Sequence, residues 1–118
     1  MVKEIKTVQE FTDAIGDKST GLVVIDFWAK WCGPCVRISP FYEELSKKYL
    51  DANFYKIDTD VADVADVLTA CEISAMPSFC FFNGGEFVEK VVGGNPVKLE
   101  EVVAARIKPK TKSDTIDK

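Results

Sequence analysis

The sequence predicts an α/β domain with a mixed, mostly parallel central sheet of about five strands and helices on both faces. Apolar, β-branched runs alternate along the chain with segments of helical periodicity. The run at 22–28 is apolar almost throughout, which is typical of a strand that is covered on both faces. Two strands near the C-terminal end flank Asn83-Gly84-Gly85, a hairpin signal that makes this last pair antiparallel.

The first half of the chain is expected to contain two helices. A short strand at 3–6 precedes the first helix, where Thr7 and Glu10 have the spacing of a capping box. After the strand at 22–28, the second helix begins in the segment Cys32-Gly33-Pro34-Cys35. The first turn of a helix accommodates proline, because a backbone N–H at this position has no partner within the helix. Pro40 lies inside this helix and should kink it.

The second half is expected to contain a strand, a helix, the hairpin and a last helix. The strand at 53–58 leads to a helix that Asp60 should cap. The hairpin strands are 77–82 and 86–92, and Asn95 with Pro96 starts the last helix. The inward faces of the two helices are expected to hold Val61, Val64, Ala65 and Leu68 in one, and Leu99, Val102 and Val103 in the other.

Composition and charge narrow the classes of function. Lys and Arg number 15 against 19 Asp and Glu, a net charge of −4, so no nucleic acid partner is expected. No apolar stretch approaches the roughly 18 residues of a membrane helix, and the first residues lack a secretory signal, so we expect a cytoplasmic protein without a membrane partner. Histidine is absent, which excludes Ser/His/Asp and Cys/His catalysis and histidine-ligated metal. We expect one domain at 1–107 and a disordered tail at 108–118.

The segment Cys32-Gly33-Pro34-Cys35 is the strongest chemical signal. Two intervening residues bring the sulfurs within bonding distance, and the helix N-terminus lowers the pKa of the first thiol. Cys32 lies at the exposed edge of the turn, so we expect Cys32 to attack a substrate disulfide and Cys35 to resolve the mixed disulfide. A structural disulfide and half of a zinc site are the alternatives. A zinc ribbon would need a second Cys-x-x-Cys, and Cys71 and Cys80 are not spaced as one.

The segment Trp28-Ala29-Lys30-Trp31-Cys32-Gly33-Pro34-Cys35 resembles the active-site segment of the thioredoxin family. The resemblance extends from about Lys3 to Ile107, because Asp26, Met76-Pro77 and Val92-Gly93-Gly94 fall where that family places them. It implies the thioredoxin fold, with no metal and with a reversible Cys32–Cys35 disulfide.

Asp26 stands in the middle of a strand that is predicted to be buried on both faces, which should raise the pKa of its carboxyl group. A structural aspartate bonded to the backbone is one interpretation. The resemblance implies instead that Asp26 moves protons to and from Cys35, and that Lys56 pairs with it. For Lys56 the alternative is an ordinary solvated lysine.

The resemblance also implies a docking surface around the sulfurs. The Met76–Pro77 bond would be cis, and Pro77 would leave a neighbouring backbone edge free to pair with an extended substrate segment. An ordinary turn or loop role is the alternative for each residue of this surface, which comprises Trp31, Gly33, Pro34, Ala75, Met76, Pro77, Gly93 and Gly94.

The activity that the resemblance implies is that of a protein-disulfide reductase, a monomer with no bound cofactor. A thioredoxin reductase would recharge it with electrons from NADPH, and its substrates would include peroxiredoxins and ribonucleotide reductase. An oxidase or isomerase of the secretory route is disfavoured, because Gly-Pro replaces the Gly-His usual between its cysteines. A binding module on the same scaffold would often lose Cys32, Cys35 or Asp26, and all three are present.

Two further cysteines lie outside this segment. Cys80 alternates within the strand at 77–82 and is expected to be a small core residue. Cys71, near the end of the third predicted helix, is expected at the surface; some cytosolic thioredoxins of eukaryotes carry cysteines here that form regulatory or intermolecular disulfides. We expect both cysteines to be inert.

Overall fold

The computed structural model describes residues 1–16 and 21–107, and the predicted tail at 108–118 lies outside them. Within these residues five strands form one sheet in the order β1-β3-β2-β4-β5. The bounds are β1 (Lys3–Glu4), β2 (Leu22–Trp28), β3 (Ala52–Asp58), β4 (Ser78–Asn83) and β5 (Glu86–Val92). β3 pairs in parallel with β1 and β2, whereas β4 pairs antiparallel with β2 and β5, so that β4 alone runs against the other strands of the described sheet. The predicted mixed sheet is confirmed.

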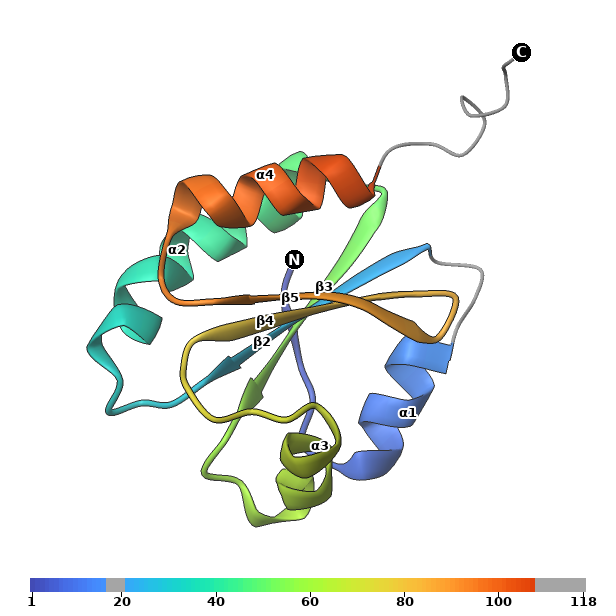
Figure 1. The fold of residues 1–118 in the computed structure, drawn as a ribbon, viewed down its shortest axis with the longest axis vertical. Helices are drawn as coiled ribbons and strands as arrows, with labels where there is room; N and C mark the ends of the chain where they lie inside the picture. The colour runs from blue at the N-terminus through green and yellow to red at the C-terminus, as the bar shows by residue number, and fades with distance from the viewer. Residues whose placement is uncertain (17–20, 108–118) are drawn as a thin grey trace.

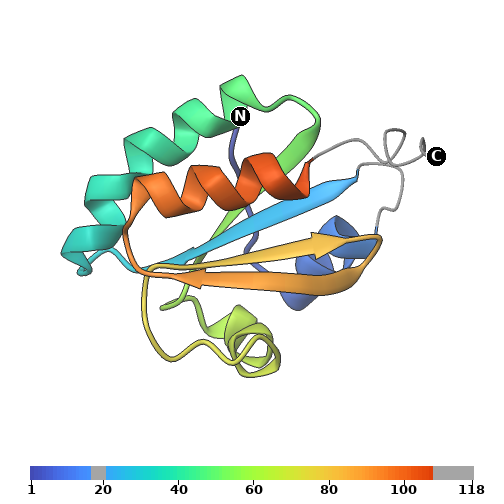
Figure 2. The same ribbon diagram turned by 45° about the horizontal axis from the view of Figure 1, so that its top comes forward.

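Helices cover both faces of this sheet (Figure 1). α2 (Gly33–Lys48) and α4 (Pro96–Arg106) lie on one face, and α1 (Val8–Gly16) and α3 (Ala65–Ala70) on the other, as Figure 2 shows from a second direction. A short 3₁₀ helix, η2 (Ala62–Val64), leads into α3. None of the helices in the described residues has the length and apolar content that a bilayer crossing requires.

Side chains of β2 alternate between two separate cores. Leu22 and Val24 pack in the core beneath α2 and α4, together with Leu45 and Leu99. Val23, Ile25 and Phe27 pack in the core beneath α1 and α3. Because successive side chains of a strand point to opposite faces, Asp26 faces α2, the helix that carries Cys35.

Local signals set several boundaries as predicted. The N–H of Glu10 donates to Thr7 Oγ1 at 3.1 Å, and Asn95 Oδ1 accepts the N–H of Lys98 at 3.1 Å, so α1 and α4 both begin at a side-chain cap. In the hairpin, Gly84 and Gly85 have φ angles of 62° and 88°. Positive φ at both central residues is the requirement of a type I′ turn, which explains the glycine pair.

The start of the third helical segment differs from the prediction. Asp60 does not cap it: the segment begins after Val61 without a side-chain cap. The opening turn is a 3₁₀ helix, in which residues three apart lie above one another. The inward row therefore runs through Val64 and Val67, which are buried, and leaves Ala65 exposed.

Tyr42 joins α2 to the two central parallel strands. Its buried ring packs against Phe54 and Phe79. Its hydroxyl oxygen lies 2.7 Å from the carbonyl oxygen of Tyr55 and 3.1 Å from that of Val24, so the O–H donates into the backbone of both β3 and β2. Nothing in the sequence marks this tyrosine apart from other aromatic residues.

We expect Tyr42→Phe to lower the free energy of unfolding by about 1–2 kcal/mol, because the ring packing remains and the buried hydrogen bond is lost. Tyr49→Phe, in the residue after the same helix, is the matched control, since the Tyr49 hydroxyl bonds Glu100 at 2.8 Å near the surface. Urea unfolding followed by circular dichroism measures both variants. An equal loss in the two would show that the Tyr42 hydroxyl does not stabilise the interior.

Candidate active site

Cys32 and Cys35 are joined by a disulfide at the N-terminus of α2, with their Cα atoms 5.3 Å apart. Cys32 is the N-cap residue of the helix, with extended backbone, and its Sγ accepts the N–H of Cys35 at 3.2 Å. Gly33 and Pro34 occupy the first helical positions, where proline needs no donor. The helix N-terminus is therefore directed at the Cys32 sulfur and stabilises negative charge there when the disulfide is open.

The two sulfurs differ in burial, although less than predicted. Cys32 is 7% exposed and Cys35 is 1% exposed. Cys32 does not lie at an open edge, because Ala29, Trp28 and Met76 pack around the pair. The order of access is nevertheless the predicted one, since a group that approaches from solvent meets Cys32 first.

The segment before β4 forms the wall opposite Cys32. The Met76–Pro77 bond is cis, which confirms the geometry that the family resemblance implied. The carbonyl oxygen of Met76 lies 3.6 Å from Cys32 Sγ. Ala75 belongs to the same wall, and its carbonyl accepts the Ser78 hydroxyl at 2.5 Å.

The end of β5 completes the rim. The N–H of Gly93 donates to the carbonyl of Pro77 at 2.8 Å, and the φ of +107° at Gly93 is a conformation that favours glycine. A Cβ at Gly94 would lie 3.4 Å from the Cβ and the carbonyl oxygen of Pro34. Three segments far apart in the sequence thus meet around the disulfide, and they bring together the predicted docking residues Gly33, Pro34, Ala75, Met76, Pro77, Gly93 and Gly94.

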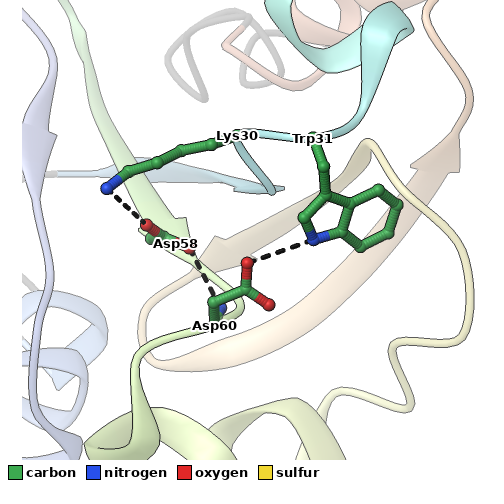
Figure 3. A network of polar contacts seen from close by, with 4 residues as sticks. All are labelled: Lys30, Trp31, Asp58 and Asp60. Atoms are coloured by element: carbon green, nitrogen blue, oxygen red, sulfur yellow. Dashed lines mark hydrogen bonds and ion pairs between the residues drawn. The ribbon is translucent and has the colours of Figure 1, made fainter.

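Trp31 extends this surface and belongs to a polar network that sequence reasoning missed (Figure 3). Its indole is 69% exposed and donates to Asp60 Oδ2 at 3.1 Å, which is the contact that replaces the predicted helix cap. Asp58 Oδ1 accepts the N–H of Asp60 at 3.0 Å, and Asp58 Oδ2 lies 3.9 Å from Lys30 Nζ. The parallel pairing of β2 with β3 was the signal that could have predicted this network. It places the residues that follow Trp28 and Asp58 at the same edge of the sheet.

Asp26 lies beneath the disulfide on the sheet. It is 3% exposed, and burial raises the pKa of its carboxyl group to about 7 in spite of the opposing charge of Lys56. Its Oδ1 has no hydrogen-bond partner among the described residues. Most buried side-chain oxygens in folded proteins accept a hydrogen bond, so this oxygen is an exception.

A cavity of about 210 Å³ connects Asp26 with Cys35. Lys56 is the register partner of Asp26 across β2 and β3, and it also lines this cavity. Its ammonium lies over the Trp28 ring, 5.4 Å from the ring centre. Between Lys56 and Asp26 the structure has no direct ion pair in the described part of the chain, so Lys56 acts on the carboxylate through its charge alone.

Metal-ligand types do not gather elsewhere: residues 1–16 and 21–107 contain no cluster of three Cys, Asp, Glu or His side chains that could hold a metal ion. The arrangement that the described residues do form is a dithiol/disulfide with one sulfur at a helix N-terminus and the other beside a buried carboxyl group. Such a pair can exchange with a disulfide of another molecule.

Comparisons with known proteins agree with this chemistry. The Thioredoxin family model matches residues 2–105. Thioredoxin-1 of Saccharomyces cerevisiae is 46% identical over 105 residues, which cover 89% of this chain and 98% of the relative. The solved thioredoxin of Malassezia sympodialis (Mala s 13) superposes with a TM-score of 0.83 at 36% identity, covering 91% of this chain and 94% of its own. A chain solved in work on the thiol-resolving mechanism of yeast mitochondrial 1-Cys peroxiredoxin via glutathione/thioredoxin systems has a TM-score of 0.81 at 33% identity, covering 88% and 94%. With these matches over almost all of its described length, the chain belongs to the thioredoxin family.

Proposed function

We propose that this protein reduces disulfides of other proteins, with Cys32 as the attacking sulfur, Cys35 as the resolving sulfur and Asp26 as the group that takes the proton of Cys35. Family membership makes the chain a thiol-disulfide oxidoreductase that needs no bound cofactor. The observation that carries the assignment of roles is the asymmetry of the disulfide. Its outer sulfur accepts a helix N–H at 3.2 Å, whereas its inner sulfur shares a cavity with a buried carboxyl group.

In the first step the Cys32 thiolate attacks one sulfur of a substrate disulfide. The substrate S–S bond breaks, a Cys32–substrate disulfide forms, and the other substrate sulfur leaves as a thiolate that takes a proton from water. The N–H of Cys35 and the N-terminus of α2 hold the attacking sulfur as a thiolate, which makes it available at neutral pH.

In the second step Cys35 attacks Cys32 Sγ and releases the second substrate sulfur. The Cys35 thiol must lose its proton for this attack, and the Asp26 carboxylate accepts it across the cavity of about 210 Å³, which has room for water between the two groups. A carboxyl group with a pKa of about 7 is half ionised near neutral pH, so it can both accept and return this proton. Two electrons reach the substrate, and the Cys32–Cys35 disulfide remains.

Substrate would dock on the surface formed by Trp31, Gly33, Pro34, Ala75, Met76, Pro77, Gly93 and Gly94. The small size of Gly93 supports this role, because the space around the position of its missing Cβ is open, whereas Gly94 packs against Pro34. The indole of Trp31 offers a large exposed apolar face beside the sulfur, and its hydrogen bond to Asp60 holds the ring in place.

The partners that we propose are a thioredoxin reductase, which would return electrons from NADPH, and disulfide-forming enzymes such as peroxiredoxins and ribonucleotide reductase. The structural similarity to a chain from the yeast peroxiredoxin work supports the peroxiredoxin class. We also propose that the protein works as a monomer in the cytoplasm, where a reducing pool would keep Cys71 and Cys80 as the thiols that they are here. Fractionation of cells against cytosolic markers tests this location.

The roles of the two cysteines predict different behaviour of two variants. With dithiothreitol as electron source, we expect the protein to accelerate the reduction of insulin disulfides and Cys32→Ser to abolish the acceleration. Cys35→Ser should instead accumulate a mixed disulfide with insulin, because the attack still occurs and the resolution does not. Mass spectrometry detects the adduct. A folded wild-type chain without acceleration would favour the binding-module alternative.

For Asp26 we expect Asp26→Asn to slow insulin reduction at least about tenfold near neutral pH, because proton transfer to a positioned base is lost. In the wild type the rate should rise with pH through about 7, as the carboxylate forms, and the variant should lose this rise. Asp13→Asn is the control, since Asp13 is an exposed carboxylate of α1 that does not line the cavity and lies on the other face of the sheet from α2. An unchanged pH–rate profile in Asp26→Asn would contradict the role.

The same carboxyl group should also affect stability. Its ordinary pKa is 3.8 and its folded pKa about 7, so between these values the folded chain holds a proton that the unfolded chain has released. The contribution of Asp26 to stability therefore falls as the pH rises from about 4 to about 7. Above that range the loss of stability from this group no longer grows with pH. We expect Asp26→Asn to raise the free energy of unfolding of the oxidised protein in mildly alkaline solution. A pKa raised by three units sets the upper bound of this gain at about 4 kcal/mol. The gain should shrink as the pH is lowered toward 4. Urea unfolding at several pH values measures it, and a gain independent of pH would refute the cause.

A further inference from the structure

Cys71 and Cys80 lie together on the face of the sheet opposite the active-site disulfide. Cys80, in β4, is fully buried in the core beneath α1 and α3, and Cys71 belongs to the same core. Cys71 ends α3 and is only 9% exposed, so the surface position expected from the sequence is wrong. Cys80 is the small core residue that was predicted.

Lys90 fastens the end of α3 above the hairpin. It is the register partner of Cys80 across β4 and β5, so the two side chains point to the same face. Its ammonium donates to the carbonyls of Cys71 and Glu72, at 3.1 and 2.8 Å. This contact holds the Cys71 backbone near Cys80, and the two side chains pack in the same core cluster.

The environment makes the two thiols chemically unequal. The hydrogen bond from the Cys80 thiol, helped by the positive charge of Lys90, holds the pKa of the Cys71 thiol below its usual value. The same interaction, together with burial, raises the pKa of the Cys80 thiol. The sulfur closer to solvent is therefore the better nucleophile, and the inner one stays protonated beside it.

A cavity of about 460 Å³ reaches Cys71 from the surface, and Cys80 lies behind it in the core. Its walls are apolar side chains of α1 and the hairpin, and Cys71 and Lys90 both line it. Phe87, at its mouth, is 52% exposed. A cavity of this size with apolar walls and a few polar groups has the character of a site for a small organic molecule. The apolar wall residues are Phe11, Ile15, Phe82 and Phe87.

We propose that Cys71 and Cys80 form a second redox pair, which an organic hydroperoxide that enters this cavity converts into a disulfide. The Cys71 thiolate attacks the outer oxygen of the hydroperoxide, and the O–O bond breaks to give a Cys71 sulfenic acid and an alkoxide that takes a proton to become the alcohol. The Cys80 thiol then attacks the Cys71 sulfur, the S–S bond forms and water leaves. Two thiols lose two electrons, and the hydroperoxide gains them as alcohol and water.

This chemistry is separate from that of Cys32 and Cys35. The central sheet lies between the two pairs, because Cys80 packs beneath α1 and α3 whereas Asp26 and Cys35 face each other on the α2 side. Direct exchange between the two disulfides of one molecule is thereby prevented. Cys71→Ser should accordingly leave insulin reduction unchanged, so that failure of the second pair and failure of the proposed reductase activity are distinguishable.

The test uses the full chain with Cys32→Ser and Cys35→Ser, so that only Cys71 and Cys80 react. The reduced protein is treated with cumene hydroperoxide, quenched with N-ethylmaleimide and analysed by mass spectrometry. We expect a product with two fewer hydrogens and no alkylation, and a proteolytic fragment in which Cys71 is linked to Cys80. The ratio of the oxidation rate with cumene hydroperoxide to that with hydrogen peroxide should be about tenfold higher for this protein than for glutathione, because the cavity binds the phenyl group. Full alkylation of both cysteines, a sulfinic acid at Cys71 or a dimer linked through Cys71 would overturn the proposal.

Two matched variants in this background assign the roles. Cys80→Ala should stop at the Cys71 sulfenic acid, which dimedone captures, whereas Cys71→Ser should leave Cys80 reduced. Circular dichroism before the reaction checks that each variant is folded. If Cys80→Ala does not fold, Cys71→Ser alone still tests whether Cys71 is the nucleophile. Lys90→Met should slow the oxidation of Cys71, since it removes the cation beside the sulfur. Hydroperoxide consumption by Cys71→Ser at the parent rate would show that Cys71 is not the nucleophile.

Discussion

The burial of β2 on both faces is the constraint on which the rest of the structure depends. A strand that is apolar on both sides has to be covered by two helical layers, and this requirement sets the positions of α2 with α4 and of α1 with α3. Alternation along the strand then turns Asp26 toward α2. Because the chain passes from β2 directly into α2, the same strand delivers Cys32 and Cys35 to the helix N-terminus above this carboxyl group.

The chemistry of the site follows from placing one disulfide between two unlike environments. On its outer side there are helix N–H groups and an apolar rim, which suit a thiolate and an approaching protein chain. On its inner side there is a small cavity with a carboxyl group that burial has made weakly acidic. The outer environment stabilises the negative charge of the Cys32 thiolate, which attacks the substrate. The inner environment provides the Asp26 carboxylate, which takes the proton of Cys35 before Cys35 resolves the mixed disulfide. Neither environment would suffice alone, since reduction needs both sulfurs in turn.

Local sequence signals predicted the elements, the caps at Thr7 and Asn95 and the glycine hairpin, because each depends on residues only a few positions apart. The apolar run around Asp26 predicted the raised pKa of its carboxyl group, and the family resemblance added its proton-transfer role and the cis Pro77. What could not be predicted depends on segments that meet only in the folded chain. Asp60 binds Trp31 instead of capping a helix because β2 and β3 end side by side. Met76, from the segment before β4, helps to bury Cys32, and residues of other strands and helices bury Cys71. Lys56 stays beside Trp28 for the same kind of reason.

The division of the interior into two cores has an evolutionary consequence. Buried residues beneath α1 and α3 form one cluster and those beneath α2 and α4 form another, with the sheet between them. Changes of side-chain volume on one face are therefore absorbed on that face. A lineage can remodel the layer that contains Cys71 and Cys80, and acquire or lose a capability there, while selection on electron transfer preserves the opposite layer. Because the sheet separates the two layers, the side chains of each layer can change in evolution independently of those of the other.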